Sequence, residues 1–187
     1  MIAKLIWFTP GLYGQMIRHA QSAAPDEACG VLLGNLIPNG IAQVAQVIQV
    51  ENIAPDPRVT YHLDDRRLAQ IMGSLERTGQ DVVGFFHSHP QSDPIPSQSD
   101  VRQAYYPDIP YLIVGLGGAR PAAAAWRMRD GAVSRVDIQV SDDLPPPPRS
   151  EISPLQKWTV LVTALLSLLL VIAWGLTLLP PAPEIPR

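Results

Sequence analysis

Two histidines stand one residue apart in the stretch His-Ser-His-Pro, directly after an apolar run that is typical of a β-strand. They are His87 and His89, two of only four histidines among the 187 residues. Because the side chains of a strand alternate between its two faces, both imidazoles are expected to point the same way. Two imidazoles side by side make a poor core and a good pair of metal ligands. The spacing therefore predicts a metal site at the end of this strand.

A third ligand is available a short distance along the chain. Three prolines between residues 90 and 96 force a turn, so that the chain can fold back toward the histidines. Asp100, three residues after Ser97, then returns a carboxylate from the first turn of the next helix. Two histidines and one carboxylate suit Zn²⁺ and leave the fourth tetrahedral position for water. We therefore expect His87, His89 and Asp100 to be metal ligands.

The same residues also have a purely structural interpretation. Ser97 and Asp100 match a capping box, in which the carboxylate of Asp100 only reaches back to the backbone at the helix start. An isolated His-x-His is likewise a weak indicator of metal. The two patterns together, at the end of a strand, favour the metal site.

This stretch resembles the motif of the JAMM (MPN+) metallopeptidases. The family motif is His-x-His-Pro, six residues, then Ser-x-x-Asp, and the residues that match it are His87, His89, Pro90, Ser97 and Asp100. The resemblance covers roughly residues 5–118. It implies a zinc peptidase that hydrolyses peptide or isopeptide bonds.

A second segment carries the same resemblance. Residues 25–34, "PDEACGVLLG", are similar to the segment of the short bacterial members that holds the family's glutamate, and Glu27 stands at the matching position. The histidine stretch is also similar to RadC-type relatives, but this early segment is closer to the short bacterial peptidases. From the residues alone, Glu27 would be a solvated charge in front of a strand, so its role rests on the resemblance.

The resemblance implies a mechanism and a substrate class. Zinc would lower the pKa of its bound water and make hydroxide available at neutral pH. Glu27 would take the proton and return it to the leaving amine, and Ser97 would hydrogen-bond the oxyanion. Family members act beside ubiquitin-like C-termini, and the short bacterial ones on sulfur-carrier proteins. Such a substrate would pass a Gly-Gly tail along the zinc by strand addition at a sheet edge.

Three other functions compete with a zinc peptidase. A non-catalytic MPN-like interaction module usually lacks a ligand, whereas all five motif positions are present here. A RadC-like protein on DNA fits poorly with a net charge of −3 and no run of Lys or Arg, so no nucleic-acid partner is expected. Cys29, the single cysteine, lies inside an apolar run, which is more typical of a buried, unreactive thiol than of a nucleophile. His19 and His62 are expected to be structural or surface residues.

The remaining patterns predict one α/β domain over residues 1–140. The resemblance implies that it has a JAMM-like (cytidine-deaminase-like) fold with a mixed β-sheet flanked by helices. Apolar runs and alternation predict the strands, helical spacing the helices, and Asp130-Gly131 a hairpin turn. The strands are expected at residues 3–8, 28–34, 41–50, 81–89, 111–117, 122–128 and 133–140, and the helices at 11–24, 66–79 and 99–106. Asp64 or Asp65 is expected to cap the second helix.

The C-terminal part differs in composition from this domain. Residues 141–157 form a Pro-rich linker, whose four consecutive prolines favour a stiff extended spacer. Residues 158–179 carry no charge, and as a helix they would be about 33 Å long, enough to cross a bilayer core of about 30 Å. We expect one transmembrane helix here rather than a buried core helix, followed by a short tail, residues 180–187.

The expected topology places the domain in the cytoplasm. The apolar patch at the N-terminus is short and broken by Pro10, unlike a secretory signal. Arg149 and Lys157 precede the span, whereas Arg187 after it is offset by Glu184, which agrees with the positive-inside tendency. The sequence thus predicts a zinc peptidase held at the membrane by its C-terminus.

Overall fold

The structure is a computed structural model of the chain, and it describes residues 2–145 and 154–177. The chain separates into two compact units, Met1–Pro147 and Pro148–Arg187. The first unit holds the sheet and the candidate site, and the second holds one described helix. Each unit is treated by itself below.

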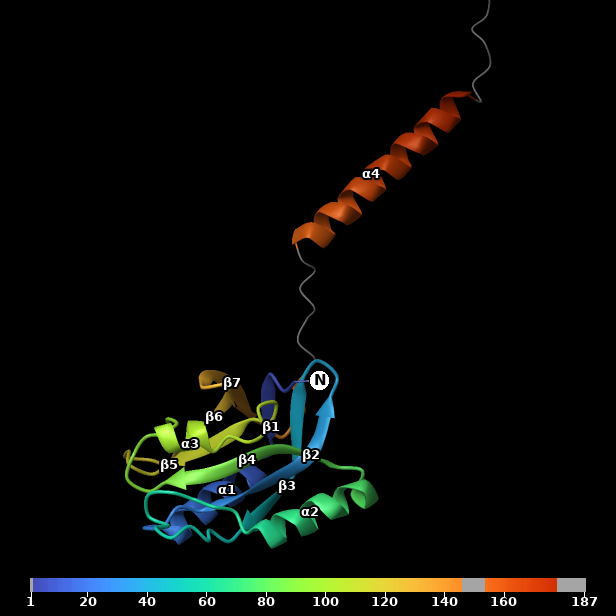
Figure 1. Cartoon of the computed structure of the whole chain (residues 1–187). Coiled ribbons are helices and arrows are strands. Elements are labelled where there is room, and N and C mark those ends of the chain that lie inside the picture. The colour runs from blue at the N-terminus through green and yellow to red at the C-terminus, as the bar shows by residue number, and fades with distance from the viewer. Residues whose placement is uncertain (1, 146–153, 178–187) are drawn as a thin grey trace, which may run out of the picture. The chain divides into compact units, whose positions relative to one another are not determined.

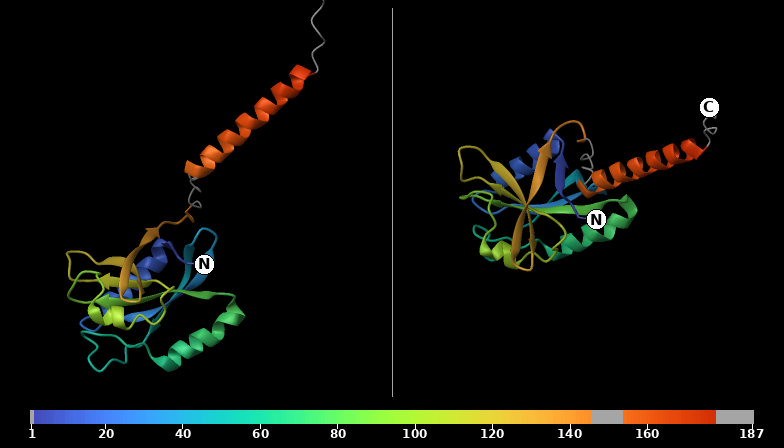
Figure 2. Two further views of the ribbon diagram at one scale, coloured as in Figure 1. Left: turned by 45° about the horizontal axis from the view of Figure 1, so that its top comes forward. Right: turned by 90° about the horizontal axis from the view of Figure 1, so that it is seen from above.

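In residues 2–145, seven strands form a closed barrel in the order β1-β3-β2-β4-β5-β6-β7 (Figures 1 and 2). The strands are β1 (Leu5–Phe8), β2 (Cys29–Ile37), β3 (Ile41–Val50), β4 (Asp81–His89), β5 (Tyr111–Gly115), β6 (Ala122–Arg129) and β7 (Ala132–Val140). Strand pairs β1–β3, β1–β7 and β4–β5 are parallel, and the other neighbours are antiparallel. The α/β class and the mixed sheet therefore agree with the sequence prediction.

The closure of the sheet was not predicted. The four-residue strand β1 pairs with β3 on one side and with β7 on the other, which joins the first and last strands of the domain. Tight turns fix the two hairpins: Asn39 and Gly40 between β2 and β3, and Asp130 and Gly131 between β6 and β7, all have positive φ. Such pairs suit hairpin turns because Asn, Asp and Gly tolerate the left-handed region.

Helix α1 (Pro10–Ala23) follows β1 directly. Its first turn is capped by Thr9, whose hydroxyl oxygen accepts a hydrogen bond from the N–H of Leu12 at 3.4 Å. Met16 and Ala20, four residues apart on one face, are fully buried against the barrel. The predicted helical spacing is therefore correct in this segment.

Helix α2 (Asp65–Thr78) shows which aspartate caps it. The side chain of Asp64 accepts from the N–H of Arg66 at 2.9 Å, so Asp64 is the N-cap. The helix ends at Gly79, which adopts the left-handed conformation (φ 63°) and donates its N–H to the carbonyl oxygen of Leu75. Glycine is favoured there because it has no Cβ.

Helix α3 (Gln98–Arg102) is shorter than the predicted helix 99–106. Pro107 disfavours the helical conformation at the residue before it. The N–H of Tyr106 instead donates to the hydroxyl of Tyr111 at 2.9 Å, outside any helical pattern. Sequence periodicity could not detect this contact, because it comes from a neighbouring strand.

Buried apolar side chains of the described domain form two clusters, one on each face of the central strands. Phe86 and Leu32 belong to the cluster that includes α1, whereas Phe85 and Val31 belong to the cluster that includes Ile71 of α2. Figure 1 shows α1 and α2 on different sides of the strands. Burial on both faces explains why β2 and β4 are continuous apolar runs rather than alternating ones.

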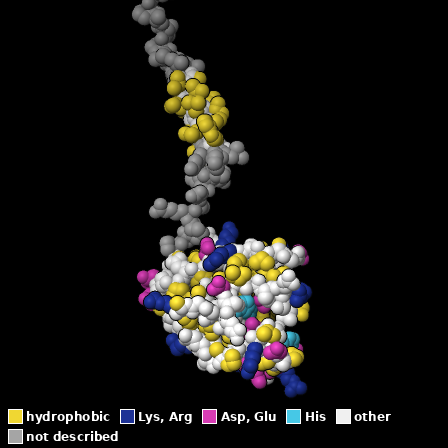
Figure 3. Space-filling model, turned by 90° about the vertical axis from the view of Figure 1, so that its left-hand side faces the viewer, with side chains coloured by type: hydrophobic (Ala, Val, Ile, Leu, Met, Phe, Trp, Pro, Cys, Tyr) yellow, Lys and Arg dark blue, Asp and Glu magenta, His cyan; other side chains and the backbone are white. Residues whose placement is uncertain are grey.

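Helix α4 (Pro154–Thr177) belongs to the second unit and begins four residues before the predicted span. Its side chains are described from Trp158 to Trp174, and these are exposed and largely apolar (Figure 3). Within the part of the chain that the structure describes, no helix is long and apolar enough to cross a membrane. The transmembrane helix expected over 158–179 is therefore not confirmed. Residues 146–153 of the expected linker, the last two residues of the expected span and the tail lie outside the described residues.

Gly34 provides a test of the hairpin packing. It lies beside an irregularity in the β2–β3 pairing, and a Cβ at this position would overlap the backbone carbonyl of Gln43. We expect Gly34→Ala to lower the free energy of unfolding by about 1–3 kcal/mol, because a backbone strand must shift. Gly73→Ala, where a Cβ meets nothing within 4 Å inside α2, is the control and should stabilise by about 0.5–1 kcal/mol. Denaturant unfolding measures both, and equal stability of Gly34→Ala and wild type would contradict the packing.

Candidate metal centre

The two histidines of the motif lie at the C-terminal end of β4. This strand lies between β2 and β5, and His87 pairs with Cys29 of β2 and Ile113 of β5. His87 is fully buried and His89 nearly so. Their side chains lie on the same face, as predicted, and their Nε2 atoms are 3.1 Å apart.

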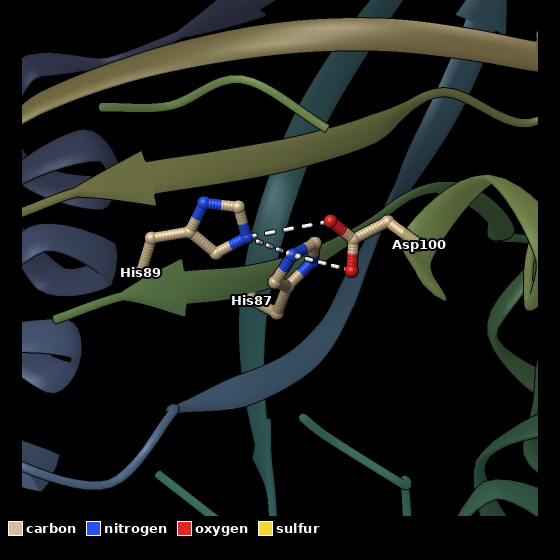
Figure 4. Close-up of side chains that lie close together, drawn as sticks. All are labelled: His87, His89 and Asp100. Carbon is tan, nitrogen blue, oxygen red and sulfur yellow. Dashed lines mark hydrogen bonds and ion pairs between the residues drawn. The ribbon is translucent and has the colours of Figure 1, made fainter. Parts of the chain in front are cut away.

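Asp100 meets both imidazoles from α3. Its Oδ1 is 3.4 Å from Nε2 of His87, and its Oδ2 is 3.4 Å from Nε2 of His89 (Figure 4). All three side chains are buried, and one ligand atom of each lies within 4.8 Å of the others. The structure therefore brings together the three residues expected to bind metal, although they come from two elements.

The capping box and the metal group share one carboxylate. Oδ2 of Asp100 accepts a hydrogen bond from the N–H of Ser97 at 2.6 Å, and the hydroxyl oxygen of Ser97 accepts from the N–H of Asp100 at 3.2 Å. These two bonds hold the first turn of α3 and orient the carboxylate toward the histidines. The structural and the metal-binding interpretations of this motif are therefore compatible.

The electrostatics of the three residues suit a cation. Burial lowers the pKa of His87, which favours the neutral imidazole that a metal requires. Burial opposes the charge of Asp100, yet hydrogen bonds from both histidines hold the pKa of this carboxyl well below its ordinary value. The Nε2 atoms of His87 and His89 lie 3.1 Å apart, and each is 3.4 Å from one oxygen of Asp100, so the three side chains turn their ligand atoms toward one another. Two nitrogens and one oxygen are a donor set that fits Zn²⁺.

The other ring nitrogens of the two histidines differ. Nδ1 of His89 lies 3.2 Å from the carbonyl oxygen of Asp93, a contact that favours the tautomer with Nε2 free for a metal. Nδ1 of His87 is buried and has no hydrogen-bond partner among the described residues. Its ring is instead stacked on that of Tyr61, with centroids 4.2 Å apart and an interplanar angle of 17°.

Glu27 reaches the same site through strand register. Cys29 pairs with His87 in the antiparallel β2–β4 ladder. Continuing that register by two residues brings Glu27 beside His89, on the same face, because strand side chains alternate. A cleft of about 240 Å³ is lined by Glu27, His89 and Ser97 among others. The structure thus gathers the expected catalytic residues around one opening.

The environment of Glu27 is not that of a solvated charge. Its exposed fraction is only 7%. Burial raises the pKa of this carboxyl to about 7, His89 lowers it, and Asp100 raises it further. A carboxyl with a pKa near neutrality can both accept and return a proton at physiological pH.

Ser97 is exposed at the opening of the cleft. Its hydroxyl lies 2.8 Å from that of Ser99, and either oxygen can be the donor. When Ser99 donates, the proton of Ser97 is free to point into the cleft. The side chain can therefore cap α3 with its oxygen and still donate a hydrogen bond.

The other candidates, Cys29, His19 and His62, do not belong to the group of potential metal ligands. Cys29 is fully buried, and its Sγ donates to the carbonyl oxygen of Val50 at 3.4 Å. Burial, and then the charge of Glu27, raise the pKa of the thiol to about 12. His62 is exposed next to Asp65, and His19 is partly buried in α1. None of these contacts supports Cys29 as a nucleophile.

Sequence reasoning missed two residues that support the site. Tyr61 stacks on His87, and Asn52 hydrogen-bonds the backbone of Glu27 at 2.9 Å. Both belong to the irregular segment between β3 and α2. No periodicity marks a residue in such a segment, and only its contacts reveal the role.

Comparisons with known proteins agree with this geometry. The family model of prokaryotic homologs of the JAB domain matches residues 9–129. The chain is 40% identical over 115 residues to a desampylase of Haloferax volcanii, covering 59% of this chain and 80% of the relative. It is 32% identical over 130 residues to a CysO-cysteine peptidase of Mycobacterium tuberculosis, covering 69% and 86%. A probable TtuB-protein conjugate cleaving protease of Thermus thermophilus is 32% identical over 117 residues, covering 62% and 74%.

A solved structure supports the same assignment. The solution structure of a protein from Desulfitobacterium hafniense superposes with a TM-score of 0.67 at 28% identity, covering 75% of this chain and 94% of that one. The chain belongs to the family of prokaryotic homologs of the JAB domain. The expectation of a JAMM-type peptidase, made from the two motif segments, is confirmed at the level of this class.

The environment of Cys29 predicts its reactivity. Because a thiol with a pKa of about 12 is protonated at neutral pH, only about one molecule in 10⁴ carries the thiolate at pH 8. We expect the native protein to resist iodoacetamide at pH 8, and the unfolded protein to be alkylated stoichiometrically. Mass spectrometry with and without denaturant measures the difference. Rapid alkylation of the native protein would restore the nucleophile hypothesis.

Proposed function

We propose that this chain is a zinc-dependent peptidase that cleaves the bond after the C-terminus of a ubiquitin-like or sulfur-carrier protein. The observation that carries the proposal is the buried His87, His89 and Asp100 group, with Glu27 and Ser97 lining the adjoining cleft. The relatives named for desampylation, for CysO-cysteine and for TtuB conjugates support the substrate class.

The chain's own residues divide the work. His87, His89 and Asp100 would hold the metal, which when bound supplies a Lewis acid that acidifies water and polarises a carbonyl. Glu27 accepts a proton in the cleft and delivers it to the leaving amine, a role suited to a carboxyl whose pKa burial raises to about 7. The hydroxyl of Ser97 donates to the carbonyl oxygen as negative charge develops on it.

Metal binding is the first test of the proposal. We expect about one zinc per chain in the purified protein and none in the His87→Ala/His89→Ala double variant, because two of three ligands are removed. Elemental analysis gives the ratio, and a thermal melt of each sample shows whether it is folded. His62→Ala is the matched control, since this exposed histidine lies outside the buried group. Equal zinc in the double variant and wild type would place the metal elsewhere.

The role of Glu27 is the second test. Glu27→Gln is nearly isosteric but cannot accept a proton, so the cleavage rate should fall about 10²–10⁴-fold while zinc content and melting temperature stay near wild type. The assay follows release of a residue placed after the Gly-Gly terminus of a ubiquitin-like or sulfur-carrier protein. Glu51→Gln is the control for loss of one carboxylate nearby. A Glu27→Gln variant that cuts at the wild-type rate would remove this residue from the mechanism.

A membrane location is a separate part of the proposal. It is supported by the absence of charge in residues 158–179 and by the exposed apolar side chains of α4 from Trp158 to Trp174. We expect the full chain in the membrane fraction after alkaline carbonate washing, and a chain ending at residue 147 in the supernatant. Full-length protein in the carbonate supernatant would rule out the anchor.

The domain should be protected from protease in right-side-out vesicles, as expected for the cytoplasmic side.

A further inference from the structure

The orientation of His87 needs a cause other than hydrogen bonding. A histidine that binds metal usually donates its second ring N–H to a neighbouring acceptor, which fixes the plane of the ring. His89 has such a partner in the carbonyl of Asp93, whereas the buried Nδ1 of His87 has none among the described residues. The ring of His87 is therefore held by packing.

Tyr61 provides that packing. Its ring lies nearly parallel to that of His87, with a centroid distance of 4.2 Å, and the side chain is buried. The ring of Tyr61 therefore restricts rotation of the imidazole about χ2, the movement that would turn Nε2 away from Asp100. Because χ2 of histidine is intrinsically soft, such a restriction requires a neighbour.

The segment that carries Tyr61 has no regular structure, so something must hold it. The Nδ2 amide group of Asn52 donates to the carbonyl oxygen of Thr60 at 3.1 Å and lies 3.5 Å from that of Pro57. Its Oδ1 accepts from the N–H of Ala54 and of His62, both at 3.0 Å. One side chain thus fixes both sides of Tyr61, at residues 60 and 62.

The same amide also reaches the candidate base. Nδ2 of Asn52 donates to the carbonyl oxygen of Glu27 at 2.9 Å, and the N–H of Glu27 donates to Pro57 at 2.6 Å. The backbone of Glu27 and the segment that carries Tyr61 are therefore held by one set of bonds. A shift of this segment would move the base and release the histidine together.

We propose that Tyr61 and Asn52 are positioning residues: the ring of Tyr61 orients His87 for metal binding, and the amide of Asn52 holds Tyr61 in place. The inference deepens the proposed function and rests on it. A merely structural role predicts that loss of either residue lowers stability without changing metal affinity. The positioning role predicts a change in affinity that is shared by the two residues.

Zinc affinity measured against a chromophoric chelator separates these roles. The full-length chain is used, purified in mild detergent and stripped of metal. We expect Tyr61→Leu to weaken zinc binding about 10–100-fold, the range typical for residues that orient a ligand. Tyr61→Phe, which keeps the ring, should restore the affinity to within about threefold of wild type. Tyr105→Leu, the same change at an exposed tyrosine, is the matched control.

A double-mutant cycle tests the link between the two residues. Asn52→Ala should weaken zinc binding in the same range as Tyr61→Leu, but add less than about threefold in the Tyr61→Leu background, because both act through one ring. Asn52→Asp keeps the shape of the side chain and its acceptor oxygen but removes the N–H donors. This variant tests the link if Asn52→Ala unfolds the protein. The visible spectrum of Co²⁺ in each variant reports the ligand geometry directly.

The outcomes are distinct. Variants with wild-type zinc affinity and a lowered melting temperature would overturn the inference and leave the proposed function intact. Fully additive effects of Asn52→Ala and Tyr61→Leu would overturn the link through Asn52. A wild-type chain that binds no zinc would overturn the proposed function and this inference together.

Discussion

The candidate site depends on the contact between the carboxylate of Asp100 and the imidazoles of His87 and His89. Each oxygen of this carboxylate lies 3.4 Å from an Nε2 atom, and one of them also accepts the N–H of Ser97. A buried charge is costly unless it is paired and hydrogen-bonded. The carboxylate is therefore stable only when the end of β4, which carries the histidines, lies next to the first turn of α3. Helix α3 has five residues, too few to be stable alone. The capping bonds and the contact with the histidines therefore keep it in place.

The barrel fixes the positions of the two histidines and of Glu27. β4 is paired on both sides, with β2 and β5, and is buried on both faces, so the backbone of His87 and His89 has little freedom. The ladder between β2 and β4 also determines where Glu27 lies, since pairing of Cys29 with His87 carries the glutamate to the level of His89. Glu27 and the two histidines are thus related through backbone hydrogen bonds, although 60 residues separate Glu27 from His87 in the chain.

Two carboxyl groups in this small region are shifted in opposite directions. Burial opposes the charge of Asp100, but hydrogen bonds from His87, His89 and Ser97 hold its pKa well below the ordinary value, so it stays ionised. Burial, opposed only in part by the charge of His89, raises the pKa of Glu27 to about 7. Environments that separate the pKa values of neighbouring acids also separate their tasks: one remains a charged ligand and the other exchanges protons. The segment that carries Asn52 and Tyr61 connects the two groups, because it contacts both the backbone of Glu27 and the ring of His87.

The sequence by itself determined the local patterns of this protein. Strand alternation places His87 and His89 on one face, the Ser-x-x-Asp spacing puts Asp100 in the first helical turn, and apolar periodicity locates the strands and the first two helices. These features follow from contacts within a few residues, which is why they can be read directly. The early end of α3, the closure of the barrel by β1, the burial of Glu27 and the support from Asn52 and Tyr61 could not be read in the same way. The end of α3 involves a side-chain contact to Tyr111 that no periodicity marks, and the other three depend on which segments pair across long sequence separations, which only the tertiary structure decides.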